Sequence, residues 1–304
     1  MPHKFNEIAP CARDASNGPD RGMQSASLAG PAVLELPRLE RAKVKKTSVK
    51  RHLSGTDFPV KNDILRALLN SEYQHLRPIL ERVDLKLGEI IYQADQRIDH
   101  VYFPETAVVA MIDTVEDGAT VEVGIIGHEG MVGINIFLGC LVTPDKAIVQ
   151  ISGSAMRMKT SALREELRFG SPLQRLLLRY TQVLLAIISQ SVACSQHHTV
   201  GQRLARWLLT MHDHAESNEF EMSHKSIAAM LGARREGVTE EAVKLQAAGL
   251  IAYRRARIQI LDEAGLKKKS CECYRFIRQQ FDGLLKEVPA FLSRKPRISR
   301  YRAR

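Results

Sequence analysis

The sequence lacks an uninterrupted apolar run long enough to cross a membrane, and it lacks the pattern of a secreted protein. No uninterrupted apolar stretch is longer than the six residues of VLLAII (Val183–Ile188), far short of the roughly 20 residues that a membrane span needs. Its first 35 residues hold no apolar segment flanked by basic residues, so no secretory signal is visible. These absences predict a cytoplasmic protein with no membrane partner.

Cysteines are few and follow no disulfide pattern. The five are Cys11, Cys140, Cys194, Cys271 and Cys273. Neither a disulfide framework nor a four-cysteine iron–sulfur spacing is present. We interpret the C-x-C pair as reduced, partly buried thiols, with a metal or redox role as the alternative. In CSQHH, Cys194 and His198 lie one helical turn apart and could chelate a metal, but we favour His197 and His198 as caps of a helix end. We therefore predict no metal site.

Motifs of catalysis are also missing. The sequence contains no P-loop, no H-E-x-x-H and no G-x-S-x-G, which would mark nucleotide hydrolysis, zinc proteolysis or acyl transfer. We predict no catalytic residue, no cofactor and no enzyme activity.

Positive charge, in contrast, is abundant. The net charge is +10 and the pI is about 9.5, which favours anionic partners such as nucleic acid. Arg38–Arg51 holds seven Lys or Arg against one Glu, and Ser293–Arg304 holds six against none. Both segments are typical of flexible basic arms, which contact phosphates or only aid solubility.

Between the arms, the hydrophobic pattern changes from helical to strand-like and back. Asn62–Leu80 shows helical spacing. From Val83 to Met158, short alternating runs separated by turns at Gly88 and at Glu116–Gly118 predict a small β-barrel or sandwich. A helix should then begin at Thr160 or Ser161.

Ser171–Gln196 predicts the longest helix, with Ser171 as its cap and Pro172 at its first position. At about 39 Å it exceeds what one small barrel can cover. We favour a two-fold dimer helix, with packing inside one subunit as the alternative. The expected dimer residues are Leu173, Leu177, Tyr180, Leu184, Ile187 and Ile188.

A second helix is predicted over Thr199–Ala215, and a helix pair follows it. Ser223 is a natural N-cap for HKSIAAML, and Gly232 ends that helix where a left-handed residue is needed. The next helix opens near Arg234, and Val238, Ala242 and Leu245 form its buried stripe. This arrangement is typical of a helix-turn-helix, whose second helix enters the DNA major groove.

The segment GLIAYRRARIQIL predicts a β-hairpin with arginines at its tip, which completes a winged helix. From Ser223 to Ile260 there are seven Lys or Arg against three Glu. Arginine reads guanine and glutamate reads cytosine in the major groove, whereas other cations contact phosphates. The expected DNA-binding residues are Ser223, Lys225, Arg234, Arg235, Glu236, Thr239, Glu240, Lys244, Arg254, Arg255 and Arg257.

The region Asn62–Leu266, and Ser223–Leu261 most specifically, resembles the Crp/Fnr transcription regulators. The resemblance implies an α+β fold with an N-terminal, jelly-roll-like β-roll sensor domain, a long dimerisation helix and a C-terminal winged helix-turn-helix. It implies a homodimer on palindromic double-stranded DNA, with RNA polymerase as a candidate partner. The expected boundaries are a disordered basic arm over 1–54, a cyclic-nucleotide-binding-like β-roll over 55–170, the dimerisation helix over 171–198, the winged helix over 199–270, and a C-terminal helix with a basic tail over 271–304.

Two departures from the family qualify this expectation. The family's base-contacting Arg-Glu pair corresponds to Arg235–Glu236, but a second arginine of nucleotide-sensing members corresponds to Glu240. The sensor loop is recognisable in Gly127, His128, Glu129 and Gly130, but TPDKA stands where a phosphate-binding arginine belongs. Lys146 in that segment cannot replace the planar contact of arginine. We therefore expect cyclic AMP not to bind tightly.

The sequence thus predicts a sequence-specific transcription regulator whose sensor ligand is unknown or lost. The alternative is an effector-binding signalling module whose C-terminal helices mediate protein contacts.

Overall fold

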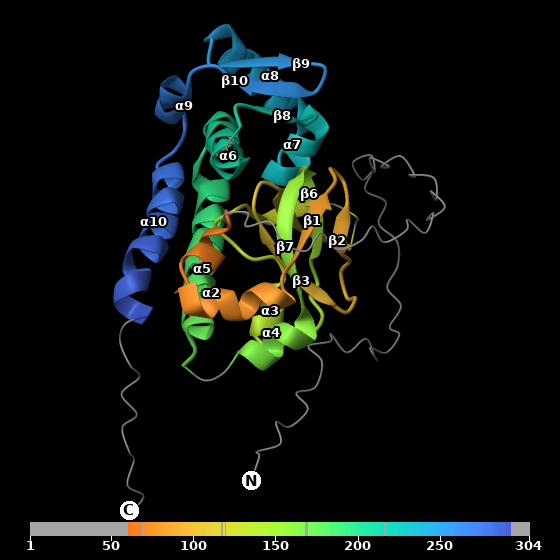
Figure 1. The fold of residues 1–304 in the computed structure, drawn as a ribbon. Helices are drawn as coiled ribbons and strands as arrows, with labels where there is room; N and C mark the ends of the chain where they lie inside the picture. Colours follow the sequence, from red (N-terminus) through yellow and green to blue (C-terminus); the bar gives the residue numbers. More distant parts are fainter. Residues whose placement is uncertain are drawn as a thin grey trace, which may run out of the picture. The chain divides into compact units, whose positions relative to one another are not determined.

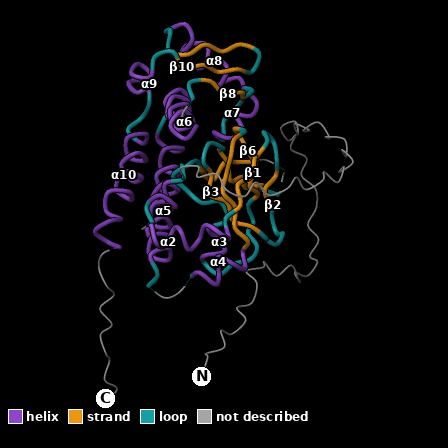
Figure 2. The backbone as a smooth tube through the Cα atoms, viewed as in Figure 1, coloured by secondary structure: helices purple, strands orange, loops and turns teal. Residues whose placement is uncertain are grey.

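The computed structural model describes residues 60–292, apart from positions 69, 117, 119, 168, 169 and 216. The basic arm expected over 1–54 and the basic tail from residue 293 onward lie outside the described residues. Figures 1 and 2 show the order of the elements along the chain.

Two antiparallel sheets form the N-terminal domain. One has the order β1-β7-β3 and the other the order β2-β6-β4-β5. Their inward side chains, such as Phe103, Val109 and Val149, belong to one core. The strands are β1 (Glu81–Leu85), β2 (Ile90–Tyr92), β3 (His100–Pro104), β4 (Val108–Thr114), β5 (Thr120–Ile126), β6 (Lys146–Ile151) and β7 (Gly153–Lys159). The predicted β-roll is therefore confirmed.

Short helices border the sheets. Asn62 caps the first of them, because its side chain accepts a hydrogen bond from the backbone N–H of Leu65. The same side chain donates to the carbonyls of Pro104 and Gly130 at 2.9 Å each, which ties the helix to the β-roll. These helices are α1 (Asp63–Arg66), α2 (Asn70–Leu76), η1 (Arg77–Ile79), α3 (Ile134–Phe137) and α4 (Thr160–Glu166).

The long helix α5 (Pro172–His197) begins as predicted, with the Ser171 side chain accepting from the backbone N–H of Gln174. Four of the six predicted dimer residues face the interior of their own chain, however. Leu173, Leu177, Tyr180 and Leu184 are buried inside their own chain, and Ile187 and Ile188 are half-buried. A helix that is apolar on several sides does not reveal from spacing alone which side meets which neighbour.

The apolar residues that α5 exposes are different ones. Leu178, Leu185 and Val192 are 54%, 57% and 60% exposed. Their spacing of seven residues places them in one line along the helix.

The C-terminal domain continues from α6 (Val200–Ala215) into the helix pair. Its three-stranded sheet has the order β8-β10-β9, and all pairings are antiparallel. Leu204, Trp207, Leu208 and Met211 of α6 are buried in its core. The other elements are β8 (Glu219–Glu221), α7 (His224–Leu231), α8 (Arg235–Ala247), β9 (Ile251–Arg254), β10 (Arg257–Ile260) and α9 (Glu263–Lys269).

A final helix, α10 (Cys273–Leu292), packs against α5 and also contacts α6. Figure 1 shows it running alongside α5. Arg278 on α10 pairs with Asp213 on α6 at 2.8 Å. The C-terminal helix is therefore part of the folded unit.

Candidate nucleic-acid interface

The turn between α7 and α8 has the geometry that the sequence predicts. The Ser223 side chain accepts from the backbone N–H of Ser226 at 3.1 Å and begins α7. Gly232 ends α7 with φ +56°, a left-handed conformation that glycine adopts at little cost. The N–H of Ala233 bonds the carbonyl of Ala228 at 2.9 Å. Both ends of α7 are thus closed by local hydrogen bonds.

Apolar packing fixes α8 against this scaffold. Val238, Ala242 and Leu245 are 0%, 5% and 5% exposed, and they share a core with α6, α7 and the three-stranded sheet. The buried stripe leaves the opposite face of α8 to solvent. Packing alone therefore determines which side chains α8 can present to a partner.

The first turn of α8 presents charged side chains that the fold does not use. Arg234, Arg235 and Glu236 are exposed, and within the described part of the chain no hydrogen bond or ion pair engages their side chains. Glu240 is also exposed one turn later. Free guanidinium groups at a helix N-terminus suit contacts to guanine or to phosphate.

Thr239, in contrast, has a structural contact. Its hydroxyl donates to the carbonyl of Arg235 at 2.9 Å and lies 3.0 Å from Nδ1 of His224. Because that hydroxyl proton is already donated, Nδ1 must supply the proton of the second bond. Thr239 therefore joins α8 to α7, and a role in base contact remains a prediction.

Sequence reasoning missed His224, which positions the helix pair on the wing. Its ring stacks on Tyr253 of β9 with centroids 4.1 Å apart and planes 20° apart. The Tyr253 hydroxyl donates to the carbonyl of Met222 at 3.1 Å. Burial, and then the nearby Arg235, lower the pKa of His224 below its usual value. Spacing gave no signal for this contact, because it joins residues from separate elements.

The wing has two kinds of arginine. Arg255 and Ala256 form the tip of the β9–β10 hairpin, with φ of +51° and +64°, as a two-residue turn of this type requires. Arg254 and Arg255 are exposed, and no hydrogen bond or ion pair among the described residues uses their side chains. Arg257, however, pairs with Glu219 at 3.3 Å and Glu221 at 3.1 Å, so two carboxylates already offset its charge.

The remaining predicted cations differ in the same way. Lys225 is exposed in the first turn of α7, whereas Lys244 pairs with Glu241 at 2.7 Å. Among the predicted DNA-binding residues, which all lie in the described part of the chain, the cations without an ion pair thus gather at the starts of α7 and α8 and at the wing tip.

Gly237 lies in the first turn of α8, where an added Cβ would meet no atom within 4 Å. We expect Gly237→Ala to raise the free energy of unfolding by about 0.5–1 kcal/mol, because alanine favours helix over glycine. Chemical denaturation measures this change. The matched control is Gly265→Ala in α9, where the Cβ would collide with Leu250 and Asp262; it should destabilise. A loss of stability in Gly237→Ala would show that this turn has a hidden packing constraint.

The predicted effector loop is filled by side chains of its own chain. Glu129 is 6% exposed; its carboxylate accepts from the N–H of Gly127 at 2.9 Å and lies 2.8 Å from Nδ1 of His214 on α6. A Cβ on Gly127 would collide with His214, and one on Gly130 with Tyr180 of α5. The absence of a side chain at these two glycines therefore allows α6 and α5 to pack closely against this loop.

The other predicted effector residues are also held by the protein. His128 lies 3.1 Å from Asp63. Lys146 lies on β6 between β2 and β4, whereas the loop follows β5. Beside it, Asp145 accepts from the Tyr92 hydroxyl at 3.2 Å. The structure thus brings Gly127, His128, Glu129 and Gly130 together, but it places Lys146 in another part of the sheet.

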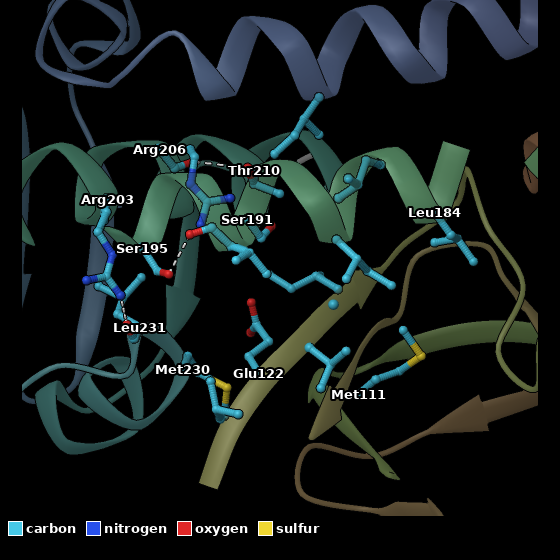
Figure 3. Close-up of a pocket in the computed structure, with 18 of the residues that line it drawn as sticks. Met111, Glu122, Leu184, Ser191, Ser195, Arg203, Arg206, Thr210, Met230 and Leu231 are labelled. Atoms are coloured by element: carbon cyan, nitrogen blue, oxygen red, sulfur yellow. Dashed lines mark hydrogen bonds between the residues drawn. The ribbon is translucent and has the colours of Figure 1, made fainter. Parts of the chain in front are cut away.

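A cavity of about 270 Å³ lies between the β-roll and the helices α5, α6 and α10 (Figure 3). Ile187, Ile188 and Phe281 line it, with Glu122, Arg203 and Arg206 as charged groups. Burial raises the pKa of Glu122 to about 7, although the hydrogen bond from Trp207 opposes this. The Trp207 indole donates to Glu122 at 3.4 Å, which links α6 to β5.

Comparisons with known proteins agree with this geometry. Residues 202–269 match the family model of the Crp-like helix-turn-helix domain. No curated protein matches the chain. Among solved structures, FixK2 from Bradyrhizobium japonicum is 20% identical, with a TM-score of 0.55, covering 64% of this chain and 98% of FixK2. A transcriptional regulator of the CRP family from Thermus thermophilus, TTHB099, is 20% identical, with a TM-score of 0.53, covering 62% of this chain and 96% of its own.

At this identity the solved structures show a shared fold, and the family model shows the nature of the C-terminal domain. The predicted resemblance is therefore confirmed: the chain carries a Crp-like helix-turn-helix domain on the fold of the Crp/Fnr regulators.

Proposed function

We propose that this protein is a transcription regulator that binds a palindromic DNA site as a homodimer. The observation that carries the proposal is the free first turn of α8. Its Arg234, Arg235 and Glu236 face solvent on a helix whose opposite side is locked into the core. Exposed charges without partners on a rigid element are suited to recognition, because the helix needs no rearrangement to present them.

Arg235 and Glu236 are assigned to bases, and the wing tip to phosphates. Arginine can make a bidentate contact to guanine, and glutamate can accept from cytosine. Arg254 and Arg255 are exposed on the wing, in an element separate from α8. They are suited to contacts with the phosphate backbone of DNA. Glu240, which stands where nucleotide-sensing relatives carry arginine, would repel phosphate unless it faces a base. The operator should therefore differ from the one those relatives read.

We assign the homodimer interface to the exposed face of α5 that carries Leu178, Leu185 and Val192. A two-fold pairing of this face would bury all three side chains in both copies. It also accounts for the apolarity of α5, which by length and composition alone would suffice to cross a membrane. We expect Leu185→Glu to convert the dimer to a monomer, because it places two like charges in the seam.

Sedimentation or light scattering at several protein concentrations measures this change. Leu87→Glu is the matched control, since Leu87 is 49% exposed on the β-roll, in the turn between β1 and β2; it should leave the dimer intact. A Leu185→Glu protein that remains dimeric would place the interface elsewhere.

The β-roll is proposed not to bind cyclic AMP tightly. Support comes from the loop itself, where His214 and Tyr180 occupy the space beside Gly127 and Gly130, and from Asp145, whose charge repels phosphate. Isothermal titration with cyclic AMP and cyclic GMP should show no binding with a micromolar Kd. Micromolar binding of either nucleotide would overturn this part of the proposal.

Selection of bound duplexes from a random pool tests the whole proposal. The full chain should enrich sequences with two-fold symmetry, with half-sites about one helical turn apart. Running the selection with and without cell extract reports whether a small molecule is needed. An unenriched pool, together with weak binding at low salt, would favour the signalling-module alternative.

A further inference from the structure

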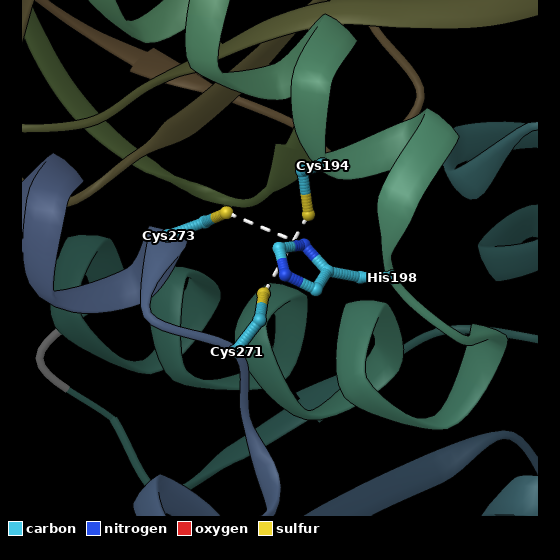
Figure 4. A group of neighbouring side chains, drawn as sticks. All are labelled: Cys194, His198, Cys271 and Cys273. Atoms are coloured by element: carbon cyan, nitrogen blue, oxygen red, sulfur yellow. Dashed lines mark hydrogen bonds between the residues drawn. The ribbon is translucent and has the colours of Figure 1, made fainter.

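Four side chains that can ligate a metal meet where α5 ends. Cys194 lies in the last turn of α5, and His198 is the C-cap residue of that helix. Cys273 is the first residue of α10, and Cys271 lies two residues before it. Cys194 and Cys271 are 77 residues apart in sequence. The ligand atoms of all four residues lie within 4.8 Å of one another, and Figure 4 shows them pointing toward a common centre. The three cysteines are at most 4% exposed.

The distances fit a single tetrahedral ion. The Sγ atoms of Cys194 and Cys271 are 3.6 Å apart, and Sγ of Cys273 lies 3.5 Å from Nδ1 of His198. Bonds of about 2.3 Å from zinc to sulfur and about 2.0–2.1 Å from zinc to nitrogen give tetrahedral edges of about 3.8 Å and about 3.5 Å. An iron–sulfur cluster spreads its four protein ligands over two or four iron atoms, so its ligand atoms would not all lie within 4.8 Å of one another as these do.

The neighbours of His198 and Cys273 are arranged as they are around metal ligands. Nε2 of His198 lies 3.3 Å from the Glu272 carboxylate, while Nδ1 faces the cysteines. Zinc-bound histidines commonly donate their other ring N–H to a carboxylate, which fixes the ring and its tautomer. The Gln190 side chain donates to Sγ of Cys273 at 3.0 Å, as groups around metal thiolates do. If the three thiols only packed in the hydrophobic core, neither the contact of His198 with Glu272 nor the hydrogen bond from Gln190 would be needed.

We propose that Cys194, His198, Cys271 and Cys273 bind one Zn²⁺ per chain as a structural site. The donor set is three thiolates and one imidazole, a combination typical of structural zinc, and four protein ligands leave no position for substrate. Zinc does not change oxidation state, and binding releases the thiol protons to solvent. The site would hold the start of α10 against the end of α5. His198 lies at the junction between α5 and α6, where the DNA-binding domain begins.

Metal analysis of the full chain tests this proposal. The protein is purified under nitrogen with reductant and without chelator, and its metals are counted by mass spectrometry. We expect about one zinc per chain. Exchange of zinc for Co²⁺ should give the visible absorption of tetrahedral cobalt thiolate, and X-ray absorption should show three sulfur ligands and one nitrogen.

Variants assign the ligands. Cys273→Ser and His198→Ala should reduce zinc content or affinity by at least about tenfold, and His198→Cys should retain zinc with four sulfur ligands. The matched control is Cys140→Ser, which changes a cysteine outside the cluster and should retain full zinc. If a ligand variant does not fold, the zinc count and the cobalt spectrum of the unmodified chain still decide the question.

Three results would overturn the proposal. These are a reduced chain without stoichiometric metal, a chain with stoichiometric iron in place of zinc, or a Cys194–Cys271 disulfide in protein kept under nitrogen. None of these outcomes bears on DNA binding, so the zinc site and the proposed function stand or fall separately.

Discussion

Glu129→Ala is expected to lower the free energy of unfolding by about 3–5 kcal/mol, the range found when one partner of a buried pair is removed. Glu129 and His214 are each 7% exposed in their side chains and lie 2.8 Å apart. Removing the carboxylate leaves the imidazole of His214 and the N–H of Gly127 buried without their acceptor. Because His214 belongs to α6, the loss should loosen the contact between the β-roll and the DNA-binding domain. Urea denaturation monitored through Trp207 measures it.

A double variant separates this effect from a simple loss of volume. Glu129→Ala combined with His214→Leu removes the stranded imidazole and should recover part of the lost stability. Glu165→Ala, at an exposed position of α4, is the control and should change stability by less than about 0.5 kcal/mol. A loss below about 1 kcal/mol in Glu129→Ala would contradict the assigned role.

The same pair predicts a dependence on pH. Burial raises the pKa of Glu129, but the charge and hydrogen bond of His214, the N–H of Gly127 and the charge of His128 together outweigh burial, and the net pKa is lowered. A carboxyl with a lowered folded pKa stabilises the protein above its unfolded pKa of about 4.3. This contribution disappears as the pH falls through the lowered value. The stability difference between the unmodified chain and Glu129→Ala should therefore shrink as the pH falls below about 4.3.

Arg235→Ala is expected to cost about 1–3 kcal/mol of binding free energy, or roughly 5–150-fold in Kd, at one base position of the operator. The Arg235 side chain is exposed and has no hydrogen-bond or ion-pair partner among the described residues, so its removal should leave stability nearly unchanged. On duplexes that carry another base at that position, the Kd of Arg235→Ala should be close to that of the unmodified chain. The variant has lost only the preference for the original base. Anisotropy titration at fixed salt, with a panel of single-base variants, measures both.

Arg255→Ala provides the contrast. As a phosphate contact at the wing tip, Arg255 should support all sequences alike, and its removal should reduce the slope of log K against log salt by about 1. Arg97→Ala is the control, since Arg97 is exposed on the β-roll and pairs with the exposed Asp99; it should alter neither affinity nor slope. If Arg235→Ala keeps full discrimination at every base position, the assignment of Arg235 to a base is wrong.

Local signals in the sequence predicted the DNA-binding half well. Ser223 and Gly232 mark the ends of α7 because capping and left-handed backbone depend on the residue itself. Val238, Ala242 and Leu245 are buried as their spacing predicts. The hairpin tip at Arg255 follows from two short strands around a basic pair. All of these features span fewer than about 15 residues.

Contacts between distant segments could not be predicted in this way. The pairing of Glu129 with His214 joins residues 85 apart, and no periodicity encodes it. The cysteine cluster likewise depends on α10 folding back along α5, so Cys194 with His198 and the C-x-C pair each looked ordinary alone. Which apolar residues of α5 meet a partner copy could not be predicted for a related reason, since α5 faces the β-roll, α10 and solvent with apolar side chains on each side.

The ratio of two dissociation constants, for a scrambled duplex and for the selected palindrome at one salt concentration, tests the central claim most directly. If the exposed turn of α8 reads bases, the unmodified chain should prefer the palindrome by at least about 10³-fold at physiological salt. Raising the salt should weaken binding to both duplexes. A ratio near one at every salt concentration would contradict sequence-specific recognition and leave only electrostatic attachment to DNA.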